Sequence, residues 1–132
     1  MAIVDSASDA ILLVQRAHNP YSGQWMLPAG FVEYGETAWD TAVREALEET
    51  GLEIALTELW GLYFGSDDPR NVAHLAVYGA RITGGSLQAG DDAADARFFR
   101  ATELPDAIAF AAHRQVLGDW RANRVGTRAR GG

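Results

Sequence analysis

Residues Gly30 to Leu52 read GFVEYGETAWDTAVREALEETGL, and this stretch decides the fold of the chain. After Thr37, alanine, valine and leucine recur at helical spacing, and Gly51 follows the last of them. Threonine is favoured at the start of a helix, and glycine readily adopts the left-handed backbone that ends one. The spacing therefore predicts a helix over about 37–50, with an apolar face that packs on a sheet.

The predicted helix carries three glutamates on one strip of its surface. Because an α-helix turns by about 100° per residue, Glu48 and Glu49 lie roughly 60° and 40° to either side of Glu45. Like charges at this spacing repel one another and destabilise a helix, and only Arg44 nearby carries the opposite charge. A divalent cation between the carboxylates would offset this cost, and such hard oxygen ligands suit Mg²⁺ or Mn²⁺.

The glycines, glutamates and arginine of this stretch also follow a known signature. It consists of Gly, five residues, Glu, seven residues, Arg-Glu, an aliphatic residue, any residue, Glu-Glu, any residue, Gly and an aliphatic residue. The matching positions are Gly30, Glu36, Arg44, Glu45, Ala46, Glu48, Glu49, Gly51 and Leu52. Every fixed polar or glycine position is filled, and only Ala46 is small for its place. The stretch therefore resembles the Nudix box, the signature of the Nudix hydrolase family.

The alternative interpretation of these charges is an acidic surface helix with a solvated face. It does not explain why two glycines keep fixed spacings to the charged positions. We therefore favour the resemblance.

The resemblance implies an α/β protein with the Nudix fold, an α/β/α sandwich around a central mixed β-sheet, in a single domain over residues 1–132. The rest of the chain agrees, because short apolar runs alternate with turn residues. The predicted strands are Ile11 to Val14, Trp25 to Leu27, Leu52 to Gly65, Val72 to Ile82 and Ala96 to Arg100.

Both ends of the chain carry further predicted elements. Met1–Val4 is interpreted as a short strand that forms a hairpin with the strand at Ile11 to Val14. A C-terminal helix is predicted at about 110–123, where apolar residues share one face. The tail Val125–Gly132 is expected to fray.

The composition narrows the class of protein. The 132 residues fit one domain, and a hydrophobic content of 48% is enough for an ordinary core. A net charge of −7 argues against non-specific binding to nucleic acid or to an anionic membrane. All eleven basic residues are arginine, so the phosphate-binding loop that requires lysine is excluded. Without cysteine the chain has no disulfide, zinc–thiolate site or thiol nucleophile.

The sequence gives fewer indications of the localisation and the oligomeric state of the protein. Met1 to Asp9 lacks the basic start and apolar segment of a secretory signal, and no apolar run approaches the roughly 20 residues that span a bilayer. We therefore expect a cytoplasmic protein that binds neither membrane nor nucleic acid. The sequence leaves the oligomeric state open, and the resemblance allows a homodimer because family members are often dimers.

The resemblance implies a reaction that depends on Mg²⁺ or Mn²⁺. Water breaks the P–O–P bridge of a nucleoside diphosphate linked to another moiety. The residues expected to carry it are Glu36, Arg44, Glu45, Glu48 and Glu49. The three helical glutamates match metal-ligand positions, with Glu49 and Glu45 ranked before Glu48. Arg44 is expected to orient a glutamate by a charge-assisted hydrogen bond, and Glu36 either to pair with Arg44 or to bind a second metal through water.

Two more metal ligands are expected outside the helix. The first is the backbone carbonyl of Ala29, although many relatives have glycine at this position. The second is Asp95, chosen from three aspartates that precede the predicted strand Ala96 to Arg100. The alternative for Asp91 and Asp92 is that they are ordinary turn residues.

The segment Asp67-Asp68-Pro69-Arg70 bears on the substrate. The resemblance associates a proline at about this distance from the box with relatives that cleave ADP-ribose. This favours ADP-ribose, a nucleotide sugar or a dinucleotide, with Pro69, Arg70 and Arg81 as candidate substrate-binding residues. An Asp-Pro pair is also typical of an ordinary turn.

Two other functions remain open. One is a (d)NTP pyrophosphohydrolase that sanitises the nucleotide pool. The box alone does not distinguish this function from the cleavage of ADP-ribose, a nucleotide sugar or a dinucleotide. The other is a non-catalytic nucleotide-sensing module, which the intact box glutamates disfavour.

The histidines and most aromatic residues are interpreted as structural. His18, His74 and His113 have no paired nucleophile, and only His113 is retained as an alternative catalytic or substrate contact. Four aromatic residues could stack on a nucleobase but are expected mainly in the core. They are Trp25, Trp60, Tyr63 and Phe64.

Overall fold

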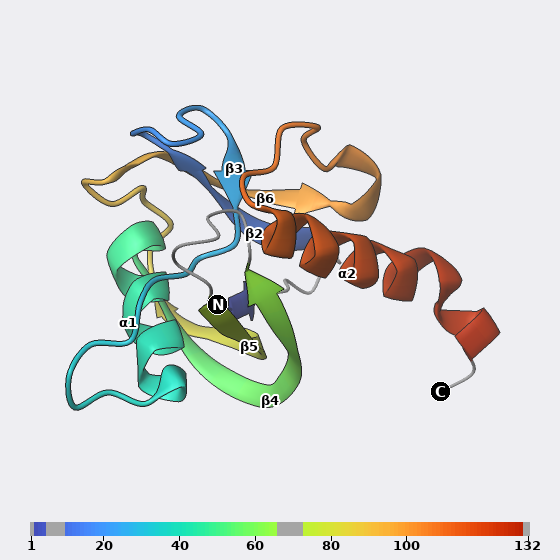
Figure 1. Ribbon diagram of the computed structural model, residues 1–132, viewed down its shortest axis with the longest axis horizontal. Helices are drawn as coiled ribbons and strands as arrows, with labels where there is room; N and C mark the ends of the chain where they lie inside the picture. Colours follow the sequence, from blue (N-terminus) through green and yellow to red (C-terminus); the bar gives the residue numbers. More distant parts are fainter. Residues whose placement is uncertain (1, 5–9, 66–72, 131–132) are drawn as a thin grey trace.

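The structure is a computed structural model that describes residues 2–4, 10–65 and 73–130 (Figure 1). Its strands are β1 (Ala2–Val4), β2 (Ala10–Arg16), β3 (Trp25–Met26), β4 (Leu52–Gly65), β5 (Ala73–Gly85) and β6 (Ala93–Arg100). Its helices are α1 (Ala38–Thr50), the short 3₁₀ turn η1 (Ala101–Glu103) and α2 (Ala111–Arg130).

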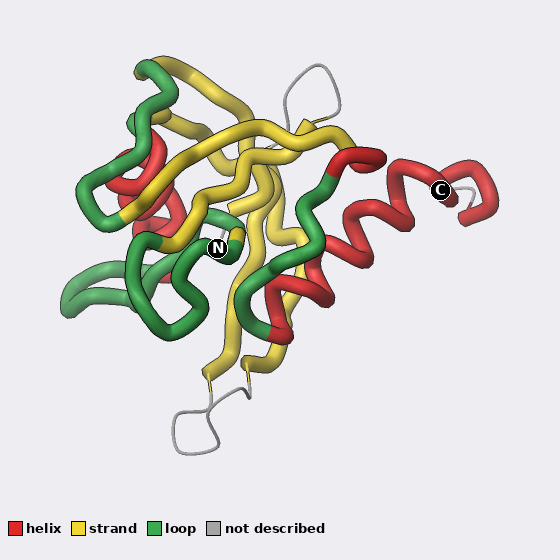
Figure 2. Tube along the Cα trace, turned by 90° about the horizontal axis from the view of Figure 1, so that it is seen from above, coloured by secondary structure: helices red, strands yellow, loops and turns green. Residues whose placement is uncertain are grey.

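The strands form two three-stranded sheets. In the mixed sheet, of order β1-β5-β4, β1 runs parallel to β5 and β4 antiparallel to it. The second sheet, of order β3-β2-β6, is antiparallel. The helices lie on opposite sides of the strands in both views (Figures 1 and 2). The predicted α/β class with a helix on either side is therefore present, with its strands divided between two sheets.

The predicted hairpin at the N-terminus is wrong. β1 pairs in parallel with β5, with Ala2 opposite Tyr78, and it does not pair with β2. β6 runs along one edge of β2 from Ala10 to Arg16, and β3 pairs with Val14 and Gln15 on the other. The edge of β5 is available instead, and the apolar residues of β1 add a third strand there.

β2 is a continuous apolar run because both of its faces are buried. Ile11 and Leu13 face one cluster, which we call the α2 core, and Leu12 faces the other, the α1 core. The α2 core comprises Ile11, Leu13, Trp25, Leu27, Val77, Ile108, Val116, Leu117 and Trp120. The α1 core comprises Leu12, Ala42, Ala46, Leu52, Ile54 and Ala80. One strand thus connects the two packed layers.

Helix α1 begins and ends as its sequence predicts. The Thr37 hydroxyl accepts a hydrogen bond from the Asp40 N–H at 3.1 Å, and the Asp40 carboxylate accepts one from the Thr37 N–H at 3.1 Å. This reciprocal pair satisfies two backbone donors that the helix itself cannot. At the other end, Gly51 has φ 75°, and its N–H donates to the Leu47 carbonyl at 2.9 Å. The predicted boundaries and caps of this helix are confirmed.

Other boundaries differ from the prediction. Strand β5 continues to Gly85 rather than ending at Ile82, and β6 begins at Ala93 rather than Ala96. Helix α2 continues to Arg130, through most of the tail that was expected to fray. That tail holds no proline, and arginine and alanine are strong helix formers. Among the helices that the structure describes, none is long and apolar enough to cross a membrane.

The loop between β3 and α1 is fastened to the helix by Glu36. Its carboxylate accepts hydrogen bonds from Arg44 Nε at 2.6 Å and Nη2 at 3.0 Å, and from the Thr41 hydroxyl at 3.0 Å. The Glu33 N–H adds a fourth at 3.0 Å. The Arg44 guanidinium, followed by the Glu33 N–H, lowers the pKa of Glu36 from 4.5 to about 2.

Gly51 gives a first prediction. Gly51→Ala should lower the free energy of unfolding by at least about 1–2 kcal/mol, because alanine is strained at positive φ. The added Cβ would also overlap the Ser86 carbonyl. The matched control is Gly118→Ala within α2, where a Cβ meets nothing. That change should be neutral or stabilise by about 0.5–1 kcal/mol. Urea unfolding of both variants measures this, and equal effects would contradict it.

Glu36 gives a second prediction, on acid stability. A carboxyl whose pKa is lowered by folding stabilises the folded state above its unfolded pKa and loses that effect as the pH falls through its folded pKa. The Glu36 contribution should therefore be complete above about pH 4.5 and decline towards about pH 2. Thermal unfolding of wild type and Glu36→Gln should give melting temperatures that differ at pH 6 and converge near pH 2. A constant difference over this range would contradict it.

Candidate functional site

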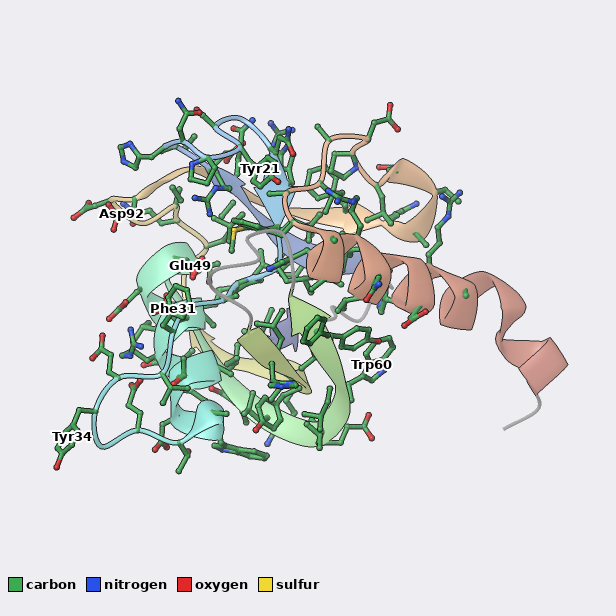
Figure 3. The ribbon with its side chains drawn as sticks, in the orientation of Figure 1. Tyr21, Phe31, Tyr34, Glu49, Trp60 and Asp92 are labelled. Carbon is green, nitrogen blue, oxygen red and sulfur yellow. The ribbon has the colours of Figure 1, made fainter. Side chains whose placement is uncertain are left out.

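A cleft of about 490 Å³ lies between α1, the end of β2 and the segment that precedes β6. We call its helical side, formed by Glu45, Glu48 and Glu49, the α1 wall. We call the side formed by residues 14–18 the β2 wall. The other lining residues are Met26, Ala29, Gly90, Asp91, Asp92 and Ala93. Figure 3 shows Glu49 on α1 and Asp92 on the segment that leads into β6.

Arg44 holds two of the three glutamates of the α1 wall. Its Nη1 donates to the Glu45 carboxylate at 2.6 Å and to the Glu48 carboxylate at 3.1 Å. Its Nη2 donates to the Phe31 carbonyl at 3.2 Å, which ties the preceding loop to the same guanidinium. The structure thus brings Arg44 and Glu36 together with the helical glutamates. The single positive charge of Arg44 lies among the negative charges of these carboxylates.

Gly30 lies directly against the Glu45 side chain. A Cβ at Gly30 would overlap the Glu45 carboxylate and its neighbouring methylene. Only a glycine allows the loop to approach this carboxylate so closely. The first glycine of the box therefore has a steric role in forming the α1 wall.

Glu49 is a partly buried acid of the site. Burial, followed by the hydrogen bond and charge of Glu45, raises the pKa of Glu49 well above its usual range, because two carboxylates in contact cannot both ionise cheaply. The Ala29 N–H donates to Glu49 at 3.2 Å and partly opposes this shift. Ala29 was expected to contribute its carbonyl to a metal, whereas the contact seen here is made by its N–H.

The donor set of the α1 wall fits a hard divalent cation. Glu45 and Glu49 bring two carboxylates together at the edge of an open cleft, and a cation between them would remove their repulsion. As the side chains stand, no three acidic or histidine groups among the described residues surround one point. The Glu48 carboxylate accepts a hydrogen bond from Arg44, and its side chain is 57% exposed, so it would have to turn away from Arg44 to join the other two.

The structure does not bring Asp95 to the cleft. Asp95 lies within β6 rather than before it, and its carboxylate accepts hydrogen bonds from Arg97 Nε at 2.7 Å and from the Ala96 N–H at 2.8 Å. The Arg97 guanidinium lowers the pKa of Asp95. Asp91 and Asp92 lie in a turn, as the alternative expected, and this turn lines the cleft.

Of the three candidate substrate residues, only Arg81 is among the described residues, and it does not line the cleft. Arg81 is exposed on β5, opposite Ala55 of β4. Pro69 and Arg70 lie outside the described residues, so their prediction stays open.

Gln15 and Arg16 of the β2 wall were not predicted, and His18 was interpreted as structural. Gln15, Arg16 and His18 line the cleft together with the glutamates. The available signal was the change from an apolar to a polar sequence after Val14, at the end of a buried strand. These residues are distant from the box in sequence and follow no motif, which is why the box did not identify them.

The remaining histidines and aromatic residues are mostly structural, as expected. His113 is buried, and its Nδ1 accepts a hydrogen bond from the Leu27 N–H at 3.1 Å. Trp25 is buried in the α2 core, whereas Phe64 is half exposed and packs edge-on against His74. Tyr34 at the tip of the box loop points away into solvent (Figure 3).

Comparisons with known proteins agree on one family. A family model of the NUDIX domain matches residues 1–120. The chain is 44% identical over 111 residues to the ADP-ribose pyrophosphatase of Methanocaldococcus jannaschii, covering 83% of this chain and 64% of that protein. It is 38% identical over 104 residues to a putative 8-oxo-dGTP diphosphatase of Bacillus subtilis, covering 78% of this chain and 66% of that protein.

The crystal structure of a NUDIX hydrolase from Nitrosomonas europaea has the same fold. Its TM-score is 0.82 at 30% sequence identity, and the match covers 95% of this chain and 72% of that one. This confirms the expected Nudix fold. The chain spans about two thirds of the length of the two curated relatives named above. The matched residues include the whole box and the cleft, and the chain therefore belongs to the Nudix hydrolase family.

Proposed function

We propose that the protein hydrolyses the pyrophosphate bond of a nucleoside diphosphate linked to another moiety, with Mg²⁺ or Mn²⁺ as cofactor. The observation that carries this proposal is the α1 wall. Three glutamates on successive positions of one helix face line an open cleft, and Arg44 fixes two of them. A structural helix has no need of such a concentration of like charge beside a cavity.

Glu45 and Glu49 would hold the cation, with Glu48 joining them. When bound there, the cation supplies positive charge against the phosphate oxygens and acidifies an attacking water. The chain's own contribution is mainly positioning, because phosphoryl transfer needs little covalent help from a protein. Gly30 and Arg44 keep the Glu45 carboxylate at the cleft edge, so that it does not have to reorganise during the reaction.

The cleft also supplies a proton acceptor. Hydrolysis releases a proton from the attacking water, and a cleft carboxylate that does not hold the cation accepts it. The acids that line the cleft beside the three ligands are Asp91 and Asp92.

We propose ADP-ribose, a nucleotide sugar or a dinucleotide as the substrate class. This choice is supported by the Methanocaldococcus jannaschii relative, which is called an ADP-ribose pyrophosphatase. The second candidate is a nucleoside triphosphate, including oxidised forms. It is supported by the Bacillus subtilis relative, called a putative 8-oxo-dGTP diphosphatase, at lower identity.

A substrate panel separates these two candidates. The panel contains ADP-ribose, NADH, diadenosine polyphosphates, UDP- and GDP-sugars, dNTPs and 8-oxo-dGTP, each with Mg²⁺ or Mn²⁺. Preferred cleavage with AMP or another monophosphate as one product and no free pyrophosphate supports the first candidate. Preferred cleavage of a dNTP with release of pyrophosphate supports the second. Metal-dependent binding without turnover of any member would instead indicate a nucleotide-sensing module.

Glu49 gives a third prediction. Glu49→Gln should lower kcat by at least about 100-fold, the usual effect of losing one preorganised electrostatic group. It should also weaken Mn²⁺ binding measured by calorimetry in the absence of substrate. Chelation with EDTA should abolish the activity of the wild type, and excess Mg²⁺ should restore it.

The matched control is Glu58→Gln, which removes an exposed glutamate of β4 that does not line the cleft. Its kcat and Mn²⁺ affinity should stay within about twofold of wild type. If Glu49→Gln retained full turnover at saturating Mg²⁺, the assignment of Glu49 to the metal would be wrong.

A further inference from the structure

The β2 wall holds a positive charge at the same cleft as the glutamates. Arg16 is the last residue of β2, and it is the only arginine among the described residues that line the cleft. The whole chain has a net charge of −7, and three of its carboxylates lie in the α1 wall. A diphosphate entering this cleft therefore needs a cationic contact beyond any metal ion, and Arg16 is placed to provide one.

The pairing of β2 with β6 becomes irregular where β2 reaches the cleft. It is regular up to Gln15 opposite Asp95, and it then shifts so that Arg16 lies opposite Ala93, which leaves Ala94 of β6 as the extra residue. Such irregularities are common next to active sites. This one lies beside Arg16, and Ala93 also lines the cleft.

Neutral groups hold the Arg16 side chain, and no described residue neutralises its charge. Its Nε donates to the Pro20 carbonyl at 2.7 Å, and its Nη1 contacts the Met26 sulfur at 3.4 Å. The guanidinium carbon lies 5.0 Å from the centre of the Phe110 ring. Within the described part of the chain no carboxylate pairs with it. These contacts fix the orientation of the guanidinium and leave its charge uncompensated.

Phe110, whose ring lies against the Arg16 guanidinium, packs against Tyr21, and both residues have a strained backbone. Tyr21 has φ 64° and Phe110 has φ 66°, and these are the only positive values among the described residues other than glycine. Their rings meet edge to face, with centroids 5.0 Å apart. Bulky residues in this backbone region are unusual, and such strain persists mainly where the surrounding structure enforces it, often at functional sites.

We propose that Arg16 binds the non-bridging oxygens of the substrate's diphosphate from the β2 wall, and that Phe110 is a positioning residue that holds its guanidinium. This inference rests on the proposed function for the identity of the substrate. With Nε held by the Pro20 carbonyl, the guanidinium can still donate a charge-assisted hydrogen bond to a phosphoryl oxygen.

The chain offers a matched control in Arg97. Its guanidinium carbon lies 5.2 Å from the centre of the Trp25 ring, so it makes the same type of aromatic contact as Arg16. In contrast to Arg16, it forms an ion pair with Asp95 at 2.7 Å and does not line the cleft. Arg97→Gln therefore removes an equal charge and an equivalent ring contact outside the site.

The test compares wild type, Arg16→Gln, Arg16→Lys and Arg97→Gln. The first measurement is calorimetric binding of α,β-methylene-ADP in the presence of Mg²⁺, because this diphosphate is not hydrolysed at the bridge. Arg16→Gln should weaken binding by about 10- to 100-fold, as expected for one charge-assisted hydrogen bond. Arg16→Lys should recover part of this loss, and Arg97→Gln should bind like wild type. Circular dichroism confirms that each variant is folded.

Turnover separates this inference from the proposed function. With a substrate from the panel, Arg16→Gln should raise KM by a similar factor with a smaller change in kcat. If the wild type turns over substrate and the Arg16 and Arg97 variants behave alike, the inference is overturned while the proposed function stands. If the wild type cleaves no substrate, the proposed function fails. In that case the binding of α,β-methylene-ADP tests the inference. Weaker binding by Arg16→Gln alone supports it. If the wild type does not bind the analogue, or Arg16→Gln binds it as well as the wild type, the inference is overturned.

Phe110 is tested by substitutions that keep or remove its ring. Phe110→Tyr should leave KM and analogue affinity within about twofold of wild type, whereas Phe110→Leu should raise both KM and the dissociation constant. In a background that already carries Arg16→Gln, Phe110→Leu should have no further effect on affinity, because it acts through the arginine. An equal effect in both backgrounds would show that Phe110 has only a structural role.

Discussion

The ion pairs of Arg44 are the constraint on which the rest of the site depends. One guanidinium, 22% exposed, contacts Glu36 in the loop and Glu45 and Glu48 on the helix. Without it the helical glutamates would repel one another, and the loop that carries Gly30 would lose its attachment to α1. Because the pairs are partly buried and share one donor, they contribute more than isolated surface ion pairs. The geometry of the α1 wall follows from this single residue.

The parts of the structure that the sequence predicted well are determined locally. Helix α1 could be placed to within one residue because Thr37 and Gly51 act on the backbone next to them. The glutamates of the box could be assigned to one face because helical spacing alone puts them there. The contact between Arg44 and Glu36 was one of the two alternatives for Glu36, and both residues belong to the box.

The parts that could not be predicted depend on distant segments. The pairing of β1 with β5 follows from which strand edges remain free, and this is known only once the sheets have formed. Asp95 was placed before a strand that in fact begins earlier, so it pairs with Arg97 and does not reach the cleft. Arg16 lines the cleft because β2 ends between α1 and the segment that precedes β6, and these segments are distant in sequence. No pattern within a single segment carries this information.

The burial of β2 on both faces affects how the protein unfolds when it is destabilised. Leu12 belongs to one core, Ile11 and Leu13 belong to the other, and the same strand ends at the cleft in Arg16. Because both cores pack on this one strand, neither core can unfold while the other stays folded. A substitution that weakens either core should therefore also disturb the cleft at the end of β2. A destabilised form of this protein would accordingly lose its binding geometry and its fold in one cooperative step, without an intermediate that still recognises its ligand.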